Sequence, residues 1–178
     1  MTRRPATPRR QQTTVLLVGE GHAEVTWLAH LKQLYVTRGN GVSVSIKNAR
    51  GKGAGHVIDF AIRQKRNAAY DRVLAVLDTD VDWGPHEQAR AHAERVAVIP
   101  SLPCLEAMLL GLHAFTREGL SSTQWKKEFY ARFGAAADEP SVYAEHFGRS
   151  VVQSGRVRIK TLDQLLEAME KPGRRHRK

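Results

Sequence analysis

The chain has 178 residues, 42% of them hydrophobic, which is enough for one globular domain with a core of its own. Its formal net charge of +10 at pH 7 favours a polyanionic partner, and nucleic acid is the commonest one. The N-terminus is charged without an apolar stretch behind it, and no apolar run approaches the roughly 20 residues of a membrane span, so we expect neither a secreted nor a membrane protein.

The positive charge is concentrated at the two ends of the chain, and the part between them is close to neutral. We expect residues 1–12 to form a disordered basic arm and residues 171–178 a basic tail, because neither has an apolar face to bury. These ends either keep the protein in solution or hold nucleic acid without sequence preference. The single cysteine, Cys104, excludes an internal disulfide and suits the cytoplasm. The terminal basic residues are Arg3, Arg4, Arg9, Arg10, Lys171, Arg174, Arg175, Arg177 and Lys178.

A short aliphatic strand is predicted at Val15–Val18, followed directly by Gly19-Glu20-Gly21. Two glycines around a carboxylate, with a helical pattern behind them, make a tight turn that exposes Glu20 at the carboxyl end of the strand. The helix covers about residues 23–35. Glu24 lies one turn into it, where its carboxylate either joins an acidic site or complements the helix dipole, and both interpretations stay open.

Apolar and polar side chains alternate over Val42–Lys47, which predicts an outer strand with one wetter face. A glycine-rich stretch, Arg50–His56, follows it. Glycines let backbone amides approach a phosphate, which Lys52 could neutralise, but the spacing matches neither a P-loop nor a dinucleotide fingerprint. We therefore favour a flexible connection that leads to a second helix near Val57.

Five consecutive aliphatic residues, Val73–Leu77, predict a strand buried on both faces inside a parallel sheet. Asp78, Asp80 and Asp82 follow at alternate positions. Ligands bind at the carboxyl edge of such sheets, and carboxylates held close together raise one another's pKa unless a cation is present. Hard oxygen ligands select Mg²⁺ or Mn²⁺. The alternative is that these acids only cap the strand and start a turn.

A weak peripheral helix is predicted from Gly84 to about Arg95, and Val96–Ile99 should form the fourth strand. The segment Pro100–Pro103 ends this strand before a strongly apolar helix that runs to Leu112. Glu106 lies in the first turns of that helix. From the pattern alone we slightly favour compensation of the helix dipole over a role in a site.

Beyond Gly119 the pattern predicts helices only. Ser121 with Gln124, and Thr161 with Gln164, have the spacing of capping boxes. Residues 134–160 show no clear pattern. An aromatic stripe at helical spacing follows the first box, and we favour a place in the core over base stacking, for which Lys126, Lys127 and Arg132 would lie beside it. The stripe consists of Trp125, Phe129 and Phe133.

These elements predict an α/β protein in which helices flank a mostly parallel sheet of about four strands. We expect an α/β domain over residues 13–118 and a helical C-terminal extension over residues 119–170 that packs on it.

The order of strands and acids resembles the TOPRIM domain, in which a strand ending in Gly-Glu-Gly is followed by helix, strand, helix and a strand ending in Asp-x-Asp. Val18–Gly21 and Leu77–Asp80 match these two motifs. Pro100–His113 looks like the Asn-Pro-x-Phe-Glu-x-Trp-Leu-Leu-x-His stretch of RloB-like proteins, a TOPRIM-type family found near restriction and phage-defence genes. In that stretch the family's Asn, Phe and Trp are replaced here by Leu102, Leu105 and Met108.

The resemblance implies a Rossmann-like TOPRIM fold with Mg²⁺ (or Mn²⁺) bound by Glu20, Asp78 and Asp80. It also implies that Glu20 takes part in proton transfer and that Glu106 supports the catalytic site. Further candidates are Glu24 and Asp82 as metal ligands, and Arg50, Lys52, Lys126 and Lys127 as contacts to phosphate or nucleic acid.

The expected function is that of a divalent-metal-dependent nuclease that hydrolyses phosphodiester bonds in DNA or RNA. Because the family is found near restriction and phage-defence genes, we expect the effector of a bacterial anti-phage defence system, with an ATPase or another defence protein as a possible partner. The alternative is a non-catalytic nucleic-acid-binding or scaffold component of a defence or restriction complex.

Overall fold

The computed structural model describes residues 12–79 and 82–173. The basic arm predicted for residues 1–12 therefore lies outside the described residues except for Gln12, as do Asp80 and residues 174–178 of the basic tail. No helix of the described part is long and apolar enough to cross a membrane.

A parallel sheet forms the centre of the molecule, in the order β2-β1-β3-β4. Its strands are β1 (Thr13–Gly19), β2 (Val42–Asn48), β3 (Arg72–Asp78) and β4 (Ala97–Ser101). The α/β prediction is confirmed, and β2 is an outer strand, as its alternating pattern indicated. β4 is longer than predicted and includes Pro100, which an outer strand tolerates because one of its edges needs no hydrogen bonds.

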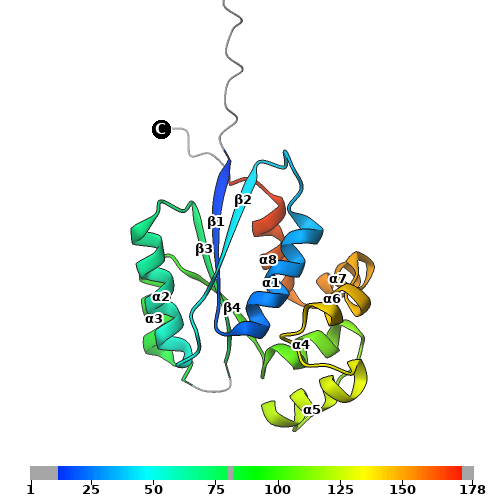
Figure 1. Cartoon of the computed structure of the whole chain (residues 1–178). Coiled ribbons are helices and arrows are strands. Elements are labelled where there is room, and N and C mark those ends of the chain that lie inside the picture. The colour runs from blue at the N-terminus through cyan, green and yellow to red at the C-terminus, as the bar shows by residue number, and fades with distance from the viewer. Residues whose placement is uncertain (1–11, 80–81, 174–178) are drawn as a thin grey trace, which may run out of the picture.

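Helices cover both faces of the sheet, which makes the fold Rossmann-like. Figure 1 shows α2 (Gly53–Asn67) and α3 (Pro85–Ala93) on one face, with α1 (His22–Tyr35) and α8 (Lys160–Glu170) on the other. The central strands are consequently buried on both sides: Leu17 and Val76 belong to the core under α1 and α8, while Leu16 and Ala75 belong to the core under α2. This double burial explains the uninterrupted aliphatic runs in the sequence.

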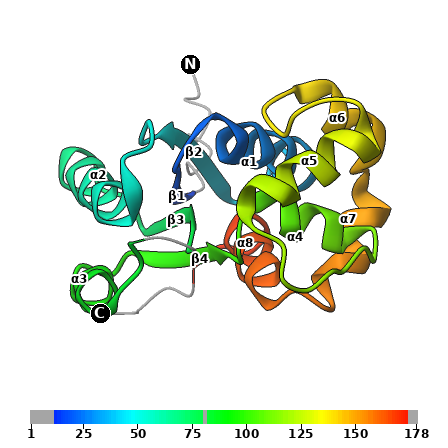
Figure 2. The ribbon, with the colours of Figure 1, turned by 90° about the horizontal axis from the view of Figure 1, so that it is seen from below.

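The remaining helices lie on the α1 side of the sheet, as Figure 2 shows. They are α4 (Leu105–Leu112), α5 (Ser122–Phe133), α6 (Pro140–His146) and α7 (Arg149–Arg156). They share one hydrophobic core with α1 and α8. Residues 134–160, which showed no clear pattern, contain α6 and α7.

Aromatic side chains fill much of this shared core. Trp125 and Phe129 are buried and Phe133 packs against the same core, so the preferred interpretation of the stripe is confirmed. Phe147 contacts the rings of both Phe129 and Trp27, which ties the segment after α6 to α5 and α1.

One of the two predicted capping boxes is present. The Ser121 hydroxyl accepts from the Gln124 N–H, and the Gln124 side chain accepts from the Ser121 N–H at 2.8 Å. The box predicted at Thr161 is wrong, because α8 begins at Lys160 with Ile159 as its N-cap, so Thr161 is already helical. Its first turn instead carries Asp163, which pairs with Arg156 of α7 at 2.6 Å.

Candidate functional site

The turn between β1 and α1 depends on Gly19. A Cβ added at this position would lie 2.9 Å from the Glu24 Cβ and 3.1 Å from the Val25 backbone nitrogen. Only glycine allows α1 to approach the end of β1 this closely. The approach brings Glu20, which follows β1, and Glu24, in the first turn of α1, to the same edge of the sheet.

Glu20 and Asp78 lie together at the carboxyl ends of two neighbouring strands. The Asp78 N–H donates to Glu20 Oε2 at 3.2 Å, and the Glu20 N–H donates to the Val76 carbonyl at 3.1 Å. The connections from β1 to β2 and from β2 to β3 lead to opposite sides of β1, so the crevice between β1 and β3 is the topological switch point. Ligands bind at this point in open α/β sheets.

Asp78 also holds the beginning of α4. Its Oδ1 accepts a hydrogen bond of 3.0 Å from the backbone N–H of Leu105, the first residue of that helix. Glu106 is the next residue, and only 7% of it is exposed. This contact therefore brings the fourth acid, which lies 28 residues beyond Asp78 in the numbering, to the same place.

Among the five carboxylates that line one pocket of about 380 Å³ at this edge, four are those of Glu20, Glu24, Asp78 and Glu106. We call it the carboxyl-edge pocket. They come from four separate segments of the chain: the β1–α1 turn, α1, the end of β3 and α4. The other lining residues are Gly21, His22, Ala23, Lys126, Ala136, Ala137 and Asp138.

Asp78 and Glu24 are held in an environment that disfavours their charges. Burial and, to a smaller extent, the nearby carboxylates of Glu24, Glu106 and Glu20 together raise the pKa of Asp78 to about 8, while Lys126 acts in the opposite direction. Burial also raises the pKa of Glu24, although its Oε2 accepts a hydrogen bond of 2.7 Å from the Gly21 N–H. A proton or a cation would relieve this repulsion.

The chemistry of the donors fits a hard divalent cation. Backbone N–H groups occupy one oxygen each of Glu20, Glu24 and Asp78, and this orients the second oxygen of each carboxylate. The buried Ser101 hydroxyl, opposite Asp78 in the strand register, has no hydrogen-bond partner among the described residues. Within residues 12–79 and 82–173, however, no three Asp, Glu, His or Cys side chains are gathered closely enough to hold an ion. The predicted ligand Asp80 lies outside these ranges.

Two other predicted site residues lie in a different pocket. Asp82 and Lys52 line a space of about 580 Å³ at the beginnings of α2 and α3, together with Glu87. The glycine-rich stretch before α2 is a turn in which four successive residues, 50–53, have left-handed backbone angles. Arg50 is exposed in this turn and lines neither of the two pockets.

α5 carries both lysines that the sequence suggested for nucleic acid. Lys126 reaches the carboxyl-edge pocket, whereas Lys127 lines only the neighbouring space along α5. Sequence reasoning missed Asp138 and Tyr130 at these two pockets. Asp138 lies in the stretch without a clear pattern, and Tyr130 lies outside the aromatic stripe, so no local signal marked either residue.

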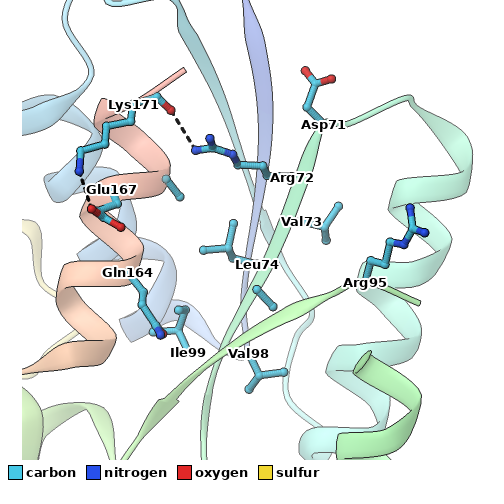
Figure 3. A pocket seen from close by; sticks show the side chains of 12 residues that line it. Asp71, Arg72, Val73, Leu74, Arg95, Val98, Ile99, Gln164, Glu167 and Lys171 are labelled. Atoms are coloured by element: carbon cyan, nitrogen blue, oxygen red, sulfur yellow. Dashed lines mark hydrogen bonds and ion pairs between the residues drawn. The ribbon is translucent and has the colours of Figure 1, made fainter. Parts of the chain in front are cut away.

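A larger pocket of about 600 Å³ lies at the opposite edge, where β3 and β4 begin beside α8 (Figure 3). We call it the amino-edge pocket. Its acids are already paired: Asp71 accepts hydrogen bonds from the Thr14 N–H and hydroxyl, and Glu167 forms an ion pair with Lys171. Size alone would favour it over the carboxyl-edge pocket, but both of its acids already have partners.

Comparisons with protein-family models, with curated proteins and with solved structures gave no match for this chain. The functional conclusion therefore depends on the geometry and chemistry of the carboxyl-edge pocket.

Proposed function

We propose that the protein is a divalent-metal-dependent nuclease that hydrolyses phosphodiester bonds in DNA or RNA, with Mg²⁺ or Mn²⁺ held at the carboxyl-edge pocket. One observation carries the proposal: carboxylates from four segments of the chain line one pocket at the topological switch point. The raised pKa of Asp78 supports it, because strongly perturbed acids in a cleft are typical of functional sites.

The roles of the residues follow from their surroundings. Bound at these carboxylates, a divalent cation would supply Lewis acidity at the phosphate and help to activate water. Asp78, fixed by the Leu105 N–H, and the buried Glu24 would hold it together with Asp80, the ligand that the resemblance adds, while the buried Glu106 would support the site. Glu20 is partly exposed at the pocket and is the acid placed to accept a proton. Lys126 is placed to bind phosphate oxygens.

The resemblance to TOPRIM and RloB-like proteins agrees with this proposal, because it selects Glu20, Asp78 and Glu106 independently of the fold. It also adds Asp80 as a ligand, a bacterial defence role and an ATPase or other partner protein. These three points depend on the resemblance alone. The net charge of +10 supports nucleic acid as the substrate.

Cleavage assays with matched carboxylate variants test the proposal. Wild-type protein, Glu20→Gln, Asp78→Asn and Glu118→Gln are incubated with plasmid DNA and with RNA, in Mg²⁺, Mn²⁺ or EDTA. We expect wild type to cut at least one substrate only with a divalent cation. Glu20→Gln and Asp78→Asn should each lower the rate at least about 100-fold. Glu118→Gln is the control, because Glu118 is exposed between α4 and α5 and lines none of the pockets described above.

Cutting that persists in both pocket variants, or in EDTA, would contradict the site. A protein that retains nucleic acid in a salt-sensitive manner without cutting it, and does so equally in both variants, would instead be the binding or scaffold component. Asp80→Asn extends the series to the residue that the resemblance selects.

A further inference from the structure

We propose that an apolar pocket along α5 binds one nucleobase of the substrate, so that the nuclease acts on single-stranded or locally unpaired nucleic acid. This inference rests on the proposed function, because it assigns the substrate class of the same site. The pocket, which we call the α5 pocket, has a volume of about 430 Å³, within the usual range for small-ligand sites.

The α5 pocket is continuous with the carboxyl-edge pocket. The two share four lining residues: Glu106, Lys126, Ala136 and Ala137. A group bound in the α5 pocket would therefore lie next to the carboxylates. A nucleotide is joined to its neighbours through phosphates, so a base held here would bring an adjacent phosphodiester to the acids.

The walls of the α5 pocket suit a flat, partly polar ring. Ala131 and Ala136 supply exposed apolar surface, and the buried Phe129 and Ala137 lie behind it. Tyr130 also lines the pocket and is 58% exposed, although most large hydrophobic side chains of the described chain are buried. An exposed aromatic ring beside an apolar wall is the usual platform on which a base stacks. The Glu106 carboxylate and the Thr123 hydroxyl can contact the polar edge of the base.

The charges around the α5 pocket favour a nucleotide over an uncharged ring. Lys126 and Lys127 both line it, are both exposed, and form no ion pair with the described residues. They can neutralise the phosphates on either side of the bound base. An apolar peptide would gain nothing from two lysines, so nucleic acid fits these walls better.

The position of the α5 pocket excludes a base that remains in a duplex. Paired bases are stacked inside the helix, and a protein reaches a whole base only in a single strand or after the base has left the stack. The α5 pocket therefore selects unpaired nucleotides, while the carboxylates act on the backbone next to them.

Binding measurements on the full-length Asp78→Asn protein separate this inference from cleavage. Fluorescence anisotropy compares a labelled single-stranded oligonucleotide, the same strand with abasic sites, and the duplex. We expect the intact single strand to bind about 5- to 100-fold more tightly than the abasic strand, the range that stacking of one base gives. Adding Tyr130→Ala should abolish this difference, whereas Tyr130→Phe should retain it, because the ring remains. Thermal unfolding checks that the exposed Tyr130 can be replaced without loss of the fold.

Equal affinity for intact and abasic strands, tighter binding of the duplex, or a base preference that survives Tyr130→Ala would overturn the subsite. Selective binding of an apolar peptide in place of the oligonucleotide would also overturn it. Base-dependent binding by a wild-type protein that never cuts would sink the nuclease proposal and leave the subsite intact. Metal-dependent cutting without any base dependence would overturn the subsite and leave the nuclease proposal intact.

Discussion

The two edges of the sheet treat their acids in opposite ways. At the amino edge, hydrogen bonds from the Thr14 N–H and hydroxyl, at 2.7 and 2.9 Å, lower the pKa of Asp71. At the carboxyl edge, burial and three neighbouring carboxylates raise the pKa of Asp78 to about 8. At the amino edge, β3 is also joined to the residue after α8, since Arg72 donates to the Lys171 carbonyl at 2.9 Å (Figure 3).

The contrast separates acids that stabilise the fold from acids that cost stability. Asp71 and Glu167 gain partners when the chain folds, whereas the partly buried Asp78 and the buried Glu24 have raised pKa values, with Lys126 as a basic side chain at the same pocket. A buried carboxylate that lowers the stability of the fold is expected to serve binding or catalysis. The larger pocket is therefore the weaker candidate for chemistry.

The largest effect on stability should come from Asp78→Asn. The folded-state pKa of Asp78 is raised, so its contribution to stability is fully present below pH 4 and is lost as the pH rises through about 8. Without divalent metal, the wild-type free energy of unfolding should fall over this range by about 2 to 4 kcal/mol more than that of Asp78→Asn, a discounted figure because Asp78 is partly exposed. Urea denaturation in EDTA at pH 5 and pH 8 measures this difference.

Asn keeps the oxygen that accepts from the Leu105 N–H, so the comparison isolates the charge. If the free energy of unfolding depended on pH in the same way in wild type and Asp78→Asn, the raised pKa would not belong to Asp78. Mg²⁺ should recover part of the lost wild-type stability at pH 8 and should have little effect on the variant.

Gly19→Ala should disturb the carboxyl edge alone. The added methyl group meets the Glu24 Cβ and the Val25 backbone, so α1 must move, at a cost of about 1 to 3 kcal/mol. Thermal unfolding should register this loss, and the cleavage rate should fall as Glu24 is displaced. Gly148→Ala is the matched control, because nothing lies within 4 Å of a Cβ added there. A fully active and stable Gly19→Ala protein would show that the close approach is not required.

The smallest effect should come from Asp71→Asn at the amino edge, and its sign is opposite to that of Asp78→Asn. The folded-state pKa of Asp71 is lowered, so its contribution is present at neutral pH and is lost as the pH falls through that lowered pKa. We expect Asp71→Asn to lower the free energy of unfolding at pH 7 by at most about 1 kcal/mol, because the carboxylate is exposed, and to leave cleavage unchanged. Equilibrium denaturation at pH 7 and pH 3 measures the difference in the free energy of unfolding between wild type and Asp71→Asn. An equal difference at both pH values would contradict its assignment to the ionised carboxylate.

Much of the fold could be predicted because its signals are local. Strands buried on both faces appear in the sequence as aliphatic runs, and the outer strand β2 appears as an alternating pattern. The turn at Gly19 is marked by a glycine on each side of Glu20. Local patterns were less successful at α8: the capping box predicted at Thr161 is wrong, because the helix already begins at Lys160, and its first-turn acid Asp163 pairs with Arg156 of α7.

The same limit applied to the site. Glu20 and Asp78 were predictable because each ends an aliphatic strand, and parallel strands end at one edge. The pattern left the role of Glu24 open and slightly favoured compensation of the helix dipole for Glu106. Both line the carboxyl-edge pocket, while Asp82, also a carboxylate, lines another pocket.

By itself the sequence determined the segments, their polarity and the two acids at strand ends, because hydrophobic periodicity is a property of neighbouring residues. Only the tertiary structure decided that α4 and α5 bring Glu106 and Lys126 to those acids, and Tyr130 to the neighbouring α5 pocket. That choice depends on the packing of a core shared by segments far apart in the chain, and no window of sequence contains the contacts that stabilise it.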